Sequence, residues 1–201
     1  MGLINFIQDN YNIVLVSSSP RRKQLLSNFG FKFNIVLPDF DEDSFVDEVP
    51  RLYCEGLSIA KIESIRSEHY NTPSIFIAAD TIVVLDDDII NKPRDRTDAI
   101  SILKKLSGKP HTVITGLTLF NNKNNRIITR SVDTVVYFRD LEHQEIVDYV
   151  DTGSPLDKAG GYGIQDDYGA FFVSRIEGCY YNVVGLPMAT LYDMLRDIVS
   201  S

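Results

Sequence analysis

The chain is poor in cysteine and has no long hydrophobic run. Its two cysteines, Cys54 and Cys179, lie far apart, which supports neither a disulfide framework nor a four-ligand zinc site. No segment approaches the roughly 18 consecutive apolar residues of a membrane-spanning helix, and residues 1–11 carry no basic residue. We therefore expect a cytoplasmic protein in a reducing compartment, with structural thiols and no membrane partner.

Positive charge is also scarce. The chain has 20 Lys and Arg residues against 28 Asp and Glu residues, a net charge of -8. A general nucleic-acid binder needs a basic face that displaces counterions from phosphates, so we expect no nucleic-acid partner. A small anionic ligand is not excluded, because salt screens charges beyond about 8 Å and a pocket responds mainly to its own side chains.

Signals for nucleophilic catalysis are absent as well. His69, His111 and His143 show no spacing typical of a catalytic triad or a metal site, so we expect structural or surface roles for them. Ser17 and the two serines that follow it lack the glycine-flanked elbow of hydrolases. The chemistry, if any, must rest on other residue types.

The hydrophobic pattern predicts a folded α/β protein. With 201 residues and 44% hydrophobic content, the chain has enough apolar side chains for an ordinary core in one domain or two small lobes. Short β-branched runs alternate with helical patterns, and two β-rich segments flank the polar turn NNKNN, which indicates a hairpin and a mixed sheet. The expected strands are a strand that ends near Asp80, a second that turns at 86–88, and the ranges 12–17, 32–37, 111–121, 126–138 and 171–176. The expected helices are one that follows Ser19 and ends at Gly30, and the ranges 50–70, 97–106, 142–150 and 182–199.

The motif SSSPRR at 17–22 is the first candidate phosphate site. Ser19 is a good N-cap and Pro20 suits the first helical position, so free N–H groups would point into the preceding loop and attract phosphate. Arg21 and Arg22 oppose the helix dipole unless an anion is bound. The alternative is an ordinary capped helix with two solvated arginines.

Two carboxylates are candidates for metal binding and water activation. Glu42 lies in the acidic loop at 39–43, whose oxygens suit Mg²⁺, although acidic loops are often only solvated. Asp80 closes an apolar strand, a position that commonly faces the ligand crevice of α/β sheets, although it also suits a turn cap. Lys92 is a cation in the following NKPRD segment, where simple solvation is the alternative.

The glycine-rich segment GSPLDKAGGYGIQ at 153–165 is a further candidate. Its small residues allow backbone N–H groups to approach an anion, and Lys158 is placed to contact a phosphate as a point charge. Gln165 is able to orient a water or a base edge through its amide. The segment matches neither the Walker nor the dinucleotide fingerprint, so a plain turn is the alternative. Among the aromatic residues, Tyr162 and Tyr168 are the candidates for base stacking.

Taken together, the motifs resemble those of the Maf family, the septum-formation-inhibitor-like nucleotide pyrophosphatases. The series is SSSPRR, DFDE, AADTIVV with NKPRD, LSGKPHTVITGL, PLDKAGGYGIQ and YYNVVGLP, and it runs from Val14 to about Leu195. The resemblance implies a single Maf-like domain over residues 1–201, an elongated mixed sheet with flanking helices, two lobes around a central cleft, and a homodimer.

The resemblance also implies a house-cleaning hydrolase that cleaves nucleoside triphosphates to the monophosphate and pyrophosphate. The expected substrates are dTTP, UTP and modified pyrimidine nucleotides, with Mg²⁺ as the divalent ion and Mn²⁺ or Co²⁺ as alternatives. Phosphate binding is implied for Ser17, Arg21, Arg22, Lys61, Lys92 and Lys158, metal binding and water activation for Glu42 and Asp80, and catalysis for Asp80, Glu42, Gln165 and Lys92.

Some positions depart from the family pattern. Gly161 stands where Ala is commoner, Cys179 where Ser is usual, and Asn91 where Gly is frequent. The pair Asp166 and Asp167 adds negative charge after Gln165, and we expect this charge to weaken the affinity for substrate or to alter the selectivity among substrates. Two other functions stay open at this point: a nucleotide-binding regulator of cell division without significant turnover, and a phosphatase releasing orthophosphate from the γ position.

Overall fold

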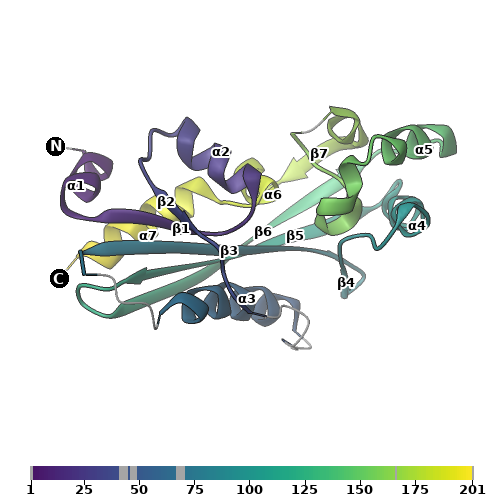
Figure 1. The fold of residues 1–201 in the computed structure, drawn as a ribbon. Coiled ribbons are helices and arrows are strands. Elements are labelled where there is room, and N and C mark those ends of the chain that lie inside the picture. The colour runs from purple at the N-terminus through teal and green to yellow at the C-terminus, as the bar shows by residue number, and fades with distance from the viewer. Residues whose placement is uncertain (1, 41–44, 46–48, 67–70, 166, 201) are drawn as a thin grey trace. The chain divides into compact units, whose positions relative to one another are not determined.

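A computed structural model describes residues 2–200 except 41–44, 46–48, 67–70 and 166 (Figure 1). Its α-helices are α1 (Leu3–Asn10), α2 (Pro20–Asn28), α3 (Pro50–Ile65), α4 (Arg96–Leu106), α5 (His143–Asp151), α6 (Tyr180–Val184) and α7 (Met188–Val199). Its strands are β1 (Asn12–Val16), β2 (Asn34–Val36), β3 (Ser74–Leu85), β4 (Asp88–Ile90), β5 (Pro110–Asn121), β6 (Arg126–Phe138) and β7 (Val173–Glu177). Short 3₁₀ segments fill Ser154–Asp157, Ala159–Gly161 and Asp167–Phe172.

The strands form a mixed sheet, which confirms the expected α/β class. Among the described residues the strand order is β2-β1-β3-β5-β6-β7, with β4 paired to β3. β1 pairs in parallel with β2 and β3, whereas β4 on β3 and β7 on β6 are antiparallel. The connections differ accordingly: α2 and α3 lie between parallel strands and a short turn joins β3 to the antiparallel β4, whereas β7 returns to β6 after a long segment that contains α5.

The chain divides into two compact units. Unit 1 comprises Met1–Asp80, Thr115–Val132 and Gly185–Ser201, and unit 2 comprises Thr81–Ile114 and Asp133–Val184. Each unit contains a hydrophobic cluster of its own, drawn from its own strands and helices.

Unit 1 is built on the parallel strands. In Figure 1, α3 lies on one side of β1 and β3, and α2 lies on the other. One buried cluster joins the strands to α3 and consists of Val14, Val16, Ile62, Ile65, Phe76, Ala78 and Phe120. The register of β1 on β3 ends at Leu15 opposite Ile77, so the chain that follows β1 is close to the next residues of β3.

Unit 2 packs α4 and α5 together and has an aromatic centre. Phe138 contacts His111, Tyr162 and Phe172 at ring-centroid distances of 4.9, 4.7 and 5.9 Å, each nearly edge to face. Such tilted pairs add to the stabilisation from apolar burial. The cluster fixes the glycine-rich segment, because Tyr162 belongs to it.

Several sequence predictions of element boundaries are wrong. Asp80 lies inside β3 instead of closing a strand, because Val83 and Leu85 carry the strand onward into the core of unit 2. The expected helix 182–199 is two helices, because Gly185 adopts a φ of 112° and Pro187, which caps α7, lacks an N–H group. Helix α1 was not predicted, and the expected end of α3 at residue 70 falls outside the described residues.

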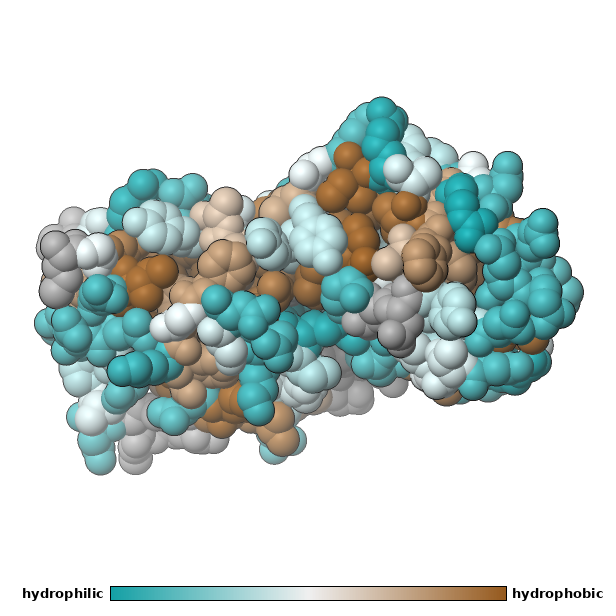
Figure 2. Space-filling view, turned by 90° about the horizontal axis from the view of Figure 1, so that it is seen from above, coloured by the Kyte–Doolittle hydropathy of each residue, from teal (hydrophilic) through white to brown (hydrophobic). Residues whose placement is uncertain are grey.

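Each unit also leaves some apolar surface uncovered. The most exposed large hydrophobic side chains are Phe171 and Leu37, at 68% and 65% exposure. On the face shown in Figure 2, hydrophobic residues in brown are interspersed with hydrophilic residues in teal. None of the described helices is both long enough and apolar enough to span a membrane.

Candidate active site

The loop after β1 forms the cap that the sequence predicts. The Ser19 hydroxyl accepts a hydrogen bond from the Arg22 backbone N–H at 3.4 Å, and Pro20 occupies the first turn of α2. The Ser17 hydroxyl accepts from the Ser19 backbone N–H at 3.1 Å. The loop is therefore held by its own serines, and α2 begins directly after the carboxyl end of a parallel strand, a common ligand position in α/β sheets.

Arg22 is a buried residue and not a solvated one. Its side chain is 8% exposed, and its Nε donates to the carbonyl oxygen of Gly185 at 2.8 Å. Its Nη1 approaches the Ser17 hydroxyl at 3.4 Å. Arg21, the neighbouring arginine, is half-buried. Burying a guanidinium is costly, so this arrangement favours a functional role for Arg22 over the alternative of a solvated cation.

Lys61 and Asp80 form a buried ion pair. Lys61 projects from α3 and its Nζ donates to Oδ1 of Asp80 on β3. The two side chains are 7% and 14% exposed. Asp80 stands three residues beyond Ile77, the last residue of β3 in register with β1, and this places a carboxylate near the end of the parallel pairing.

The thiol of Cys54 shows that the charged groups of unit 1 lie close together. Burial and, after it, the negative charge of Asp80 raise the pKa of Cys54 to about 12, while the hydrogen bond from the Gly116 backbone and the charges of Arg22 and Lys61 act in the opposite direction. Charges influence a pKa in this way only at short range. The structure therefore brings Arg22, Lys61 and Asp80 into one neighbourhood, with Ser17 bonded to Arg22.

Sequence reasoning missed two residues of this neighbourhood. Gly185 supplies the carbonyl that holds Arg22, whereas the sequence placed Gly185 inside an expected helix over 182–199 and gave it no role. Cys54 was expected to be merely structural, yet its Sγ lies 3.2 Å from the Asp80 carbonyl oxygen. No local pattern points to either contact, because 163 and 26 positions separate the partners.

The candidate cations of unit 2 differ from one another. Lys92 is exposed in the segment between β4 and α4. Lys158 is buried, and its Nζ donates to the Ser154 carbonyl at 2.6 Å, the Ser154 hydroxyl at 3.1 Å and the Asp157 carboxylate at 2.8 Å. In this structure the Lys158 ammonium thus organises its own loop.

Gln165 carries a buried amide nitrogen that the described residues do not satisfy. None of them accepts a hydrogen bond from its Nε2. A buried donor without an acceptor costs free energy, so such a group is a candidate for contact with a ligand. Tyr162, three residues earlier, is anchored by a 2.8 Å hydrogen bond between its hydroxyl and Nε2 of His111. Tyr162 is buried in the core and is therefore not a stacking surface, whereas Tyr168 is 54% exposed.

The possible metal ligands are few within the described part of the chain. There, no group of three or more His, Cys, Asp or Glu side chains is arranged to hold an ion. Asp80 is described, whereas Glu42, the second expected ligand, lies outside the described residues. Mg²⁺ commonly takes one or two protein carboxylates and completes its shell with waters and substrate phosphates, so a sparse carboxylate set fits that ion.

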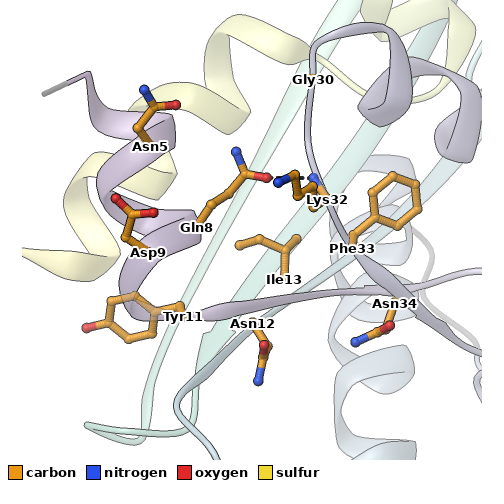
Figure 3. Close-up of a pocket in the computed structure, with 10 residues that line it drawn as sticks. All are labelled: Asn5, Gln8, Asp9, Tyr11, Asn12, Ile13, Gly30, Lys32, Phe33 and Asn34. Carbon is orange, nitrogen blue, oxygen red and sulfur yellow. Dashed lines mark hydrogen bonds between the residues drawn. The ribbon is translucent and has the colours of Figure 1, made fainter.

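A separate pocket of about 590 Å³ lies beside α1, the start of β1 and the chain before β2 (Figure 3). At its edge the Lys32 backbone N–H donates to Oε1 of Gln8 at 2.7 Å. The lining residues are Asn5, Gln8, Asp9, Tyr11, Asn12, Ile13, Gly30, Lys32, Phe33 and Asn34. None of the expected phosphate-binding or catalytic residues lines it, so the candidate active site is elsewhere.

Comparison with known proteins agrees with the motif series. The family described as Maf-like protein matches residues 12–198. A dTTP/UTP pyrophosphatase of Geotalea uraniireducens (strain Rf4) is 44% identical over 190 residues, covering 94% of this chain and 96% of the relative. Proteins of the same name from Thermoanaerobacter sp. (strain X514) and Clostridioides difficile (strain 630) are 44% and 43% identical, covering 92% and 94% of this chain and 95% and 96% of the relatives. On this similarity along almost its entire length, the chain belongs to the Maf family.

Proposed function

We propose that the protein is a nucleoside triphosphate pyrophosphatase that cleaves between the α and β phosphates and releases monophosphate and pyrophosphate. Its substrates in this proposal are dTTP, UTP and modified pyrimidine nucleotides, in line with the relatives named dTTP/UTP pyrophosphatase. The observation that carries the proposal is the buried group of Asp80, Lys61 and Arg22. A protein that only binds nucleotides has no need for a carboxylate among the cations that hold phosphates.

The residues of unit 1 supply the grip on phosphate and the base. Arg22, Lys61 and the N-terminus of α2 offset the negative charge of the triphosphate, together with Ser17 and Arg21. Asp80 accepts a proton from the attacking water, or orients that water toward the α-phosphorus. Positioning and charge stabilisation account for most of phosphoryl-type catalysis, so no covalent intermediate is needed.

The residues of unit 2 complete the proposal. Gln165 donates from its buried Nε2 to the water or to the substrate, which satisfies a group that no described residue satisfies. Lys92 and Lys158 act as point charges on phosphate oxygens. For Lys158 this requires its ammonium to exchange at least one of its present contacts with Ser154 and Asp157.

A divalent ion belongs to the proposal, with Asp80 and Glu42 as its protein ligands beside the triphosphate. Mg²⁺ is the proposed ion, and Mn²⁺ or Co²⁺ are alternatives. When bound, such an ion polarises phosphoryl oxygens and draws charge away from the reacting phosphorus. We also propose a cytoplasmic homodimer that removes unwanted nucleotides, as the family resemblance implies.

The proposal is tested by measuring the products of each nucleotide. The purified protein is incubated with Mg²⁺ and one of dTTP, UTP, CTP, a modified pyrimidine triphosphate or 7-methyl-GTP, and pyrophosphate and orthophosphate are assayed separately. We expect pyrophosphate and monophosphate in equal amounts, fastest with dTTP and UTP, and none after chelation of the metal.

The other functions predict different results. Orthophosphate and diphosphate as the products would indicate cleavage at the γ position. Nucleotide binding without turnover would support the regulator of cell division. A preference for 7-methyl-GTP would overturn the pyrimidine assignment and leave the reaction class standing.

A further inference from the structure

Helix α3 carries three polar side chains along one buried face. Cys54, Ser58 and Lys61 are spaced by four and three residues, so they lie one above another on the helix. Their exposed fractions are 0%, 0% and 5%. A polar side chain that is fully buried needs a hydrogen-bond partner, and each of these three finds one on a strand of unit 1.

The Cys54 thiol stands between two neighbouring strands. It donates to the Asp80 carbonyl oxygen of β3 at 3.2 Å and accepts from the Gly116 backbone N–H of β5 at 3.0 Å. β3 and β5 are adjacent in the sheet. The thiol therefore connects a backbone donor of one strand to a backbone acceptor of the next.

This contact requires the helix to come very close to the sheet. A Cβ atom on Gly116 would overlap the carbonyl oxygen of Cys54 and would lie 2.7 Å from its carbonyl carbon. Both of these are backbone atoms, which cannot turn aside as a side chain can. Glycine at position 116 thus allows α3 to bring Cys54 within reach of both strands.

Asp80 is consequently held from α3 at two points. Lys61 binds the Asp80 carboxylate, and Cys54 binds the Asp80 backbone carbonyl oxygen. The carbon of that carbonyl is bonded directly to the Cα that carries the carboxylate side chain. We propose that Cys54 is a positioning residue for Asp80: its thiol fixes the peptide plane at Asp80 and thereby the direction of the carboxylate. The inference rests on the proposed function, in which Asp80 activates water.

Ser58 provides a matched control on the same helix face. Its hydroxyl donates to the Glu55 carbonyl at 2.7 Å and shares a 2.7 Å hydrogen bond with the Thr118 hydroxyl. Neither of these hydrogen bonds involves Asp80. Removing this hydroxyl should destabilise the docking of α3 without changing the orientation of the carboxylate.

The first measurement compares steady-state kinetics of Cys54→Val, Cys54→Ser and Ser58→Ala with the wild type. Valine is apolar and somewhat larger than cysteine, and it neither donates nor accepts, so we expect kcat to fall about tenfold with KM within twofold, since small displacements of catalytic groups are costly. Serine keeps both functions and should hold kcat within about threefold. Ser58→Ala should lower the melting temperature and keep kcat within twofold.

The second measurement does not depend on activity. In a Cys179→Ser background, the infrared S–H stretching band reports Cys54 alone. We expect a band at the lower frequency of a hydrogen-bonded thiol, and its disappearance in Cys54→Ser. If Cys54→Val is unfolded at the assay temperature, Cys54→Ala replaces it with the same expectation.

Three results would overturn the proposal: an unchanged kcat in the apolar variant, a fall in kcat with Ser58→Ala as large as with Cys54→Val, or a band at the frequency of a free thiol. If the wild type releases pyrophosphate from no nucleotide, the proposed function fails. The infrared band then still decides whether the thiol bridges the two strands.

Discussion

The candidate residues of unit 1 are held by partners far away in the sequence, whereas Lys158 in unit 2 is held by partners close to it in the sequence. In unit 1, Lys61 meets Asp80 across 19 positions and Arg22 meets Gly185 across 163. In unit 2, Lys158 is held by Ser154 and Asp157, within four positions. The first arrangement exists only when the unit is folded, whereas the second is largely a property of one loop.

In the proposed reaction the two units have different roles. Unit 1 provides a rigid, buried group of charges, in which each member limits the movement of the others. Unit 2 provides a glycine-rich loop fixed at one end by the His111–Tyr162 hydrogen bond, with Gln165 unsatisfied by any described residue. Substitutions in the two units should therefore have different signatures in activity and stability.

The largest effect is expected from Asp80→Asn in unit 1. The substitution keeps the shape of the side chain and removes its charge, so kcat should fall at least about 100-fold with little change in nucleotide affinity. Pyrophosphate release and calorimetric titration measure the two quantities, and circular dichroism checks folding, because Lys61 loses its counter-ion. Asp88→Asn, an exposed carboxylate on β4, is the control. An Asp80→Asn enzyme of full activity would remove Asp80 from the mechanism.

A smaller effect is expected from the pH dependence of stability in unit 2. Burial lowers the pKa of His111 from 6.5 to about 4, so between these values the unfolded chain takes up a proton that the native protein does not. The stability linked to the neutral His111 is fully present above pH 6.5, and it is lost as the pH falls from 6.5 toward 4. From pH 7.5 to 5, the His111 contribution to the free energy of unfolding should fall by about 2 kcal/mol.

Urea unfolding at both pH values tests this expectation, with His111→Leu as the comparison. The variant should lose the share of the pH dependence that His111 contributes. The carboxylate of Glu145, whose pKa Arg139 lowers from 4.5 to about 2, titrates below this window and does not obscure it. Identical slopes for wild type and variant would show that His111 is not buried as a neutral group.

The smallest effect is expected from Gln165→Leu. No described residue accepts from the buried Nε2, so the substitution removes no hydrogen bond to them and should leave the melting temperature unchanged or higher. Loss of one hydrogen bond to substrate or water should reduce kcat/KM about tenfold. Gln144→Leu, an exposed glutamine on α5, is the control for a general effect of leucine. A fall in stability with normal kcat/KM would assign Gln165 a structural role.

The sequence predicted the local features of both units. Ser19 and Pro20 began α2 as expected, because a cap is satisfied within one turn of chain. The β-branched runs marked the strands, although β3 proved continuous through Asp80 because its later residues enter a second core. Helix α1 escaped prediction, since Gly2 provides no side-chain cap and the first turn has no acidic residue.

The candidate site was predicted in its residue types but not in its contacts. The motifs named Arg22, Lys61 and Asp80 separately, and nothing in their spacing paired Lys61 with Asp80 or placed Cys54 against the Asp80 carbonyl. Lys158 appeared available to a phosphate, yet the structure buries it among oxygens of its own loop. A short sequence window cannot predict such outcomes, because they depend on which groups are desolvated together.

By itself, the sequence determined the family, the order of the motifs and the kinds of side chain available for the chemistry. Tertiary structure decided which of them act together: it set Asp80 between Lys61 and Cys54, and it tied Arg22 to Gly185. The reason is physical. Buried charges and polar groups must find partners wherever the packed chain offers them, and those partners are fixed by the close approach of helix and sheet and not by distance along the sequence.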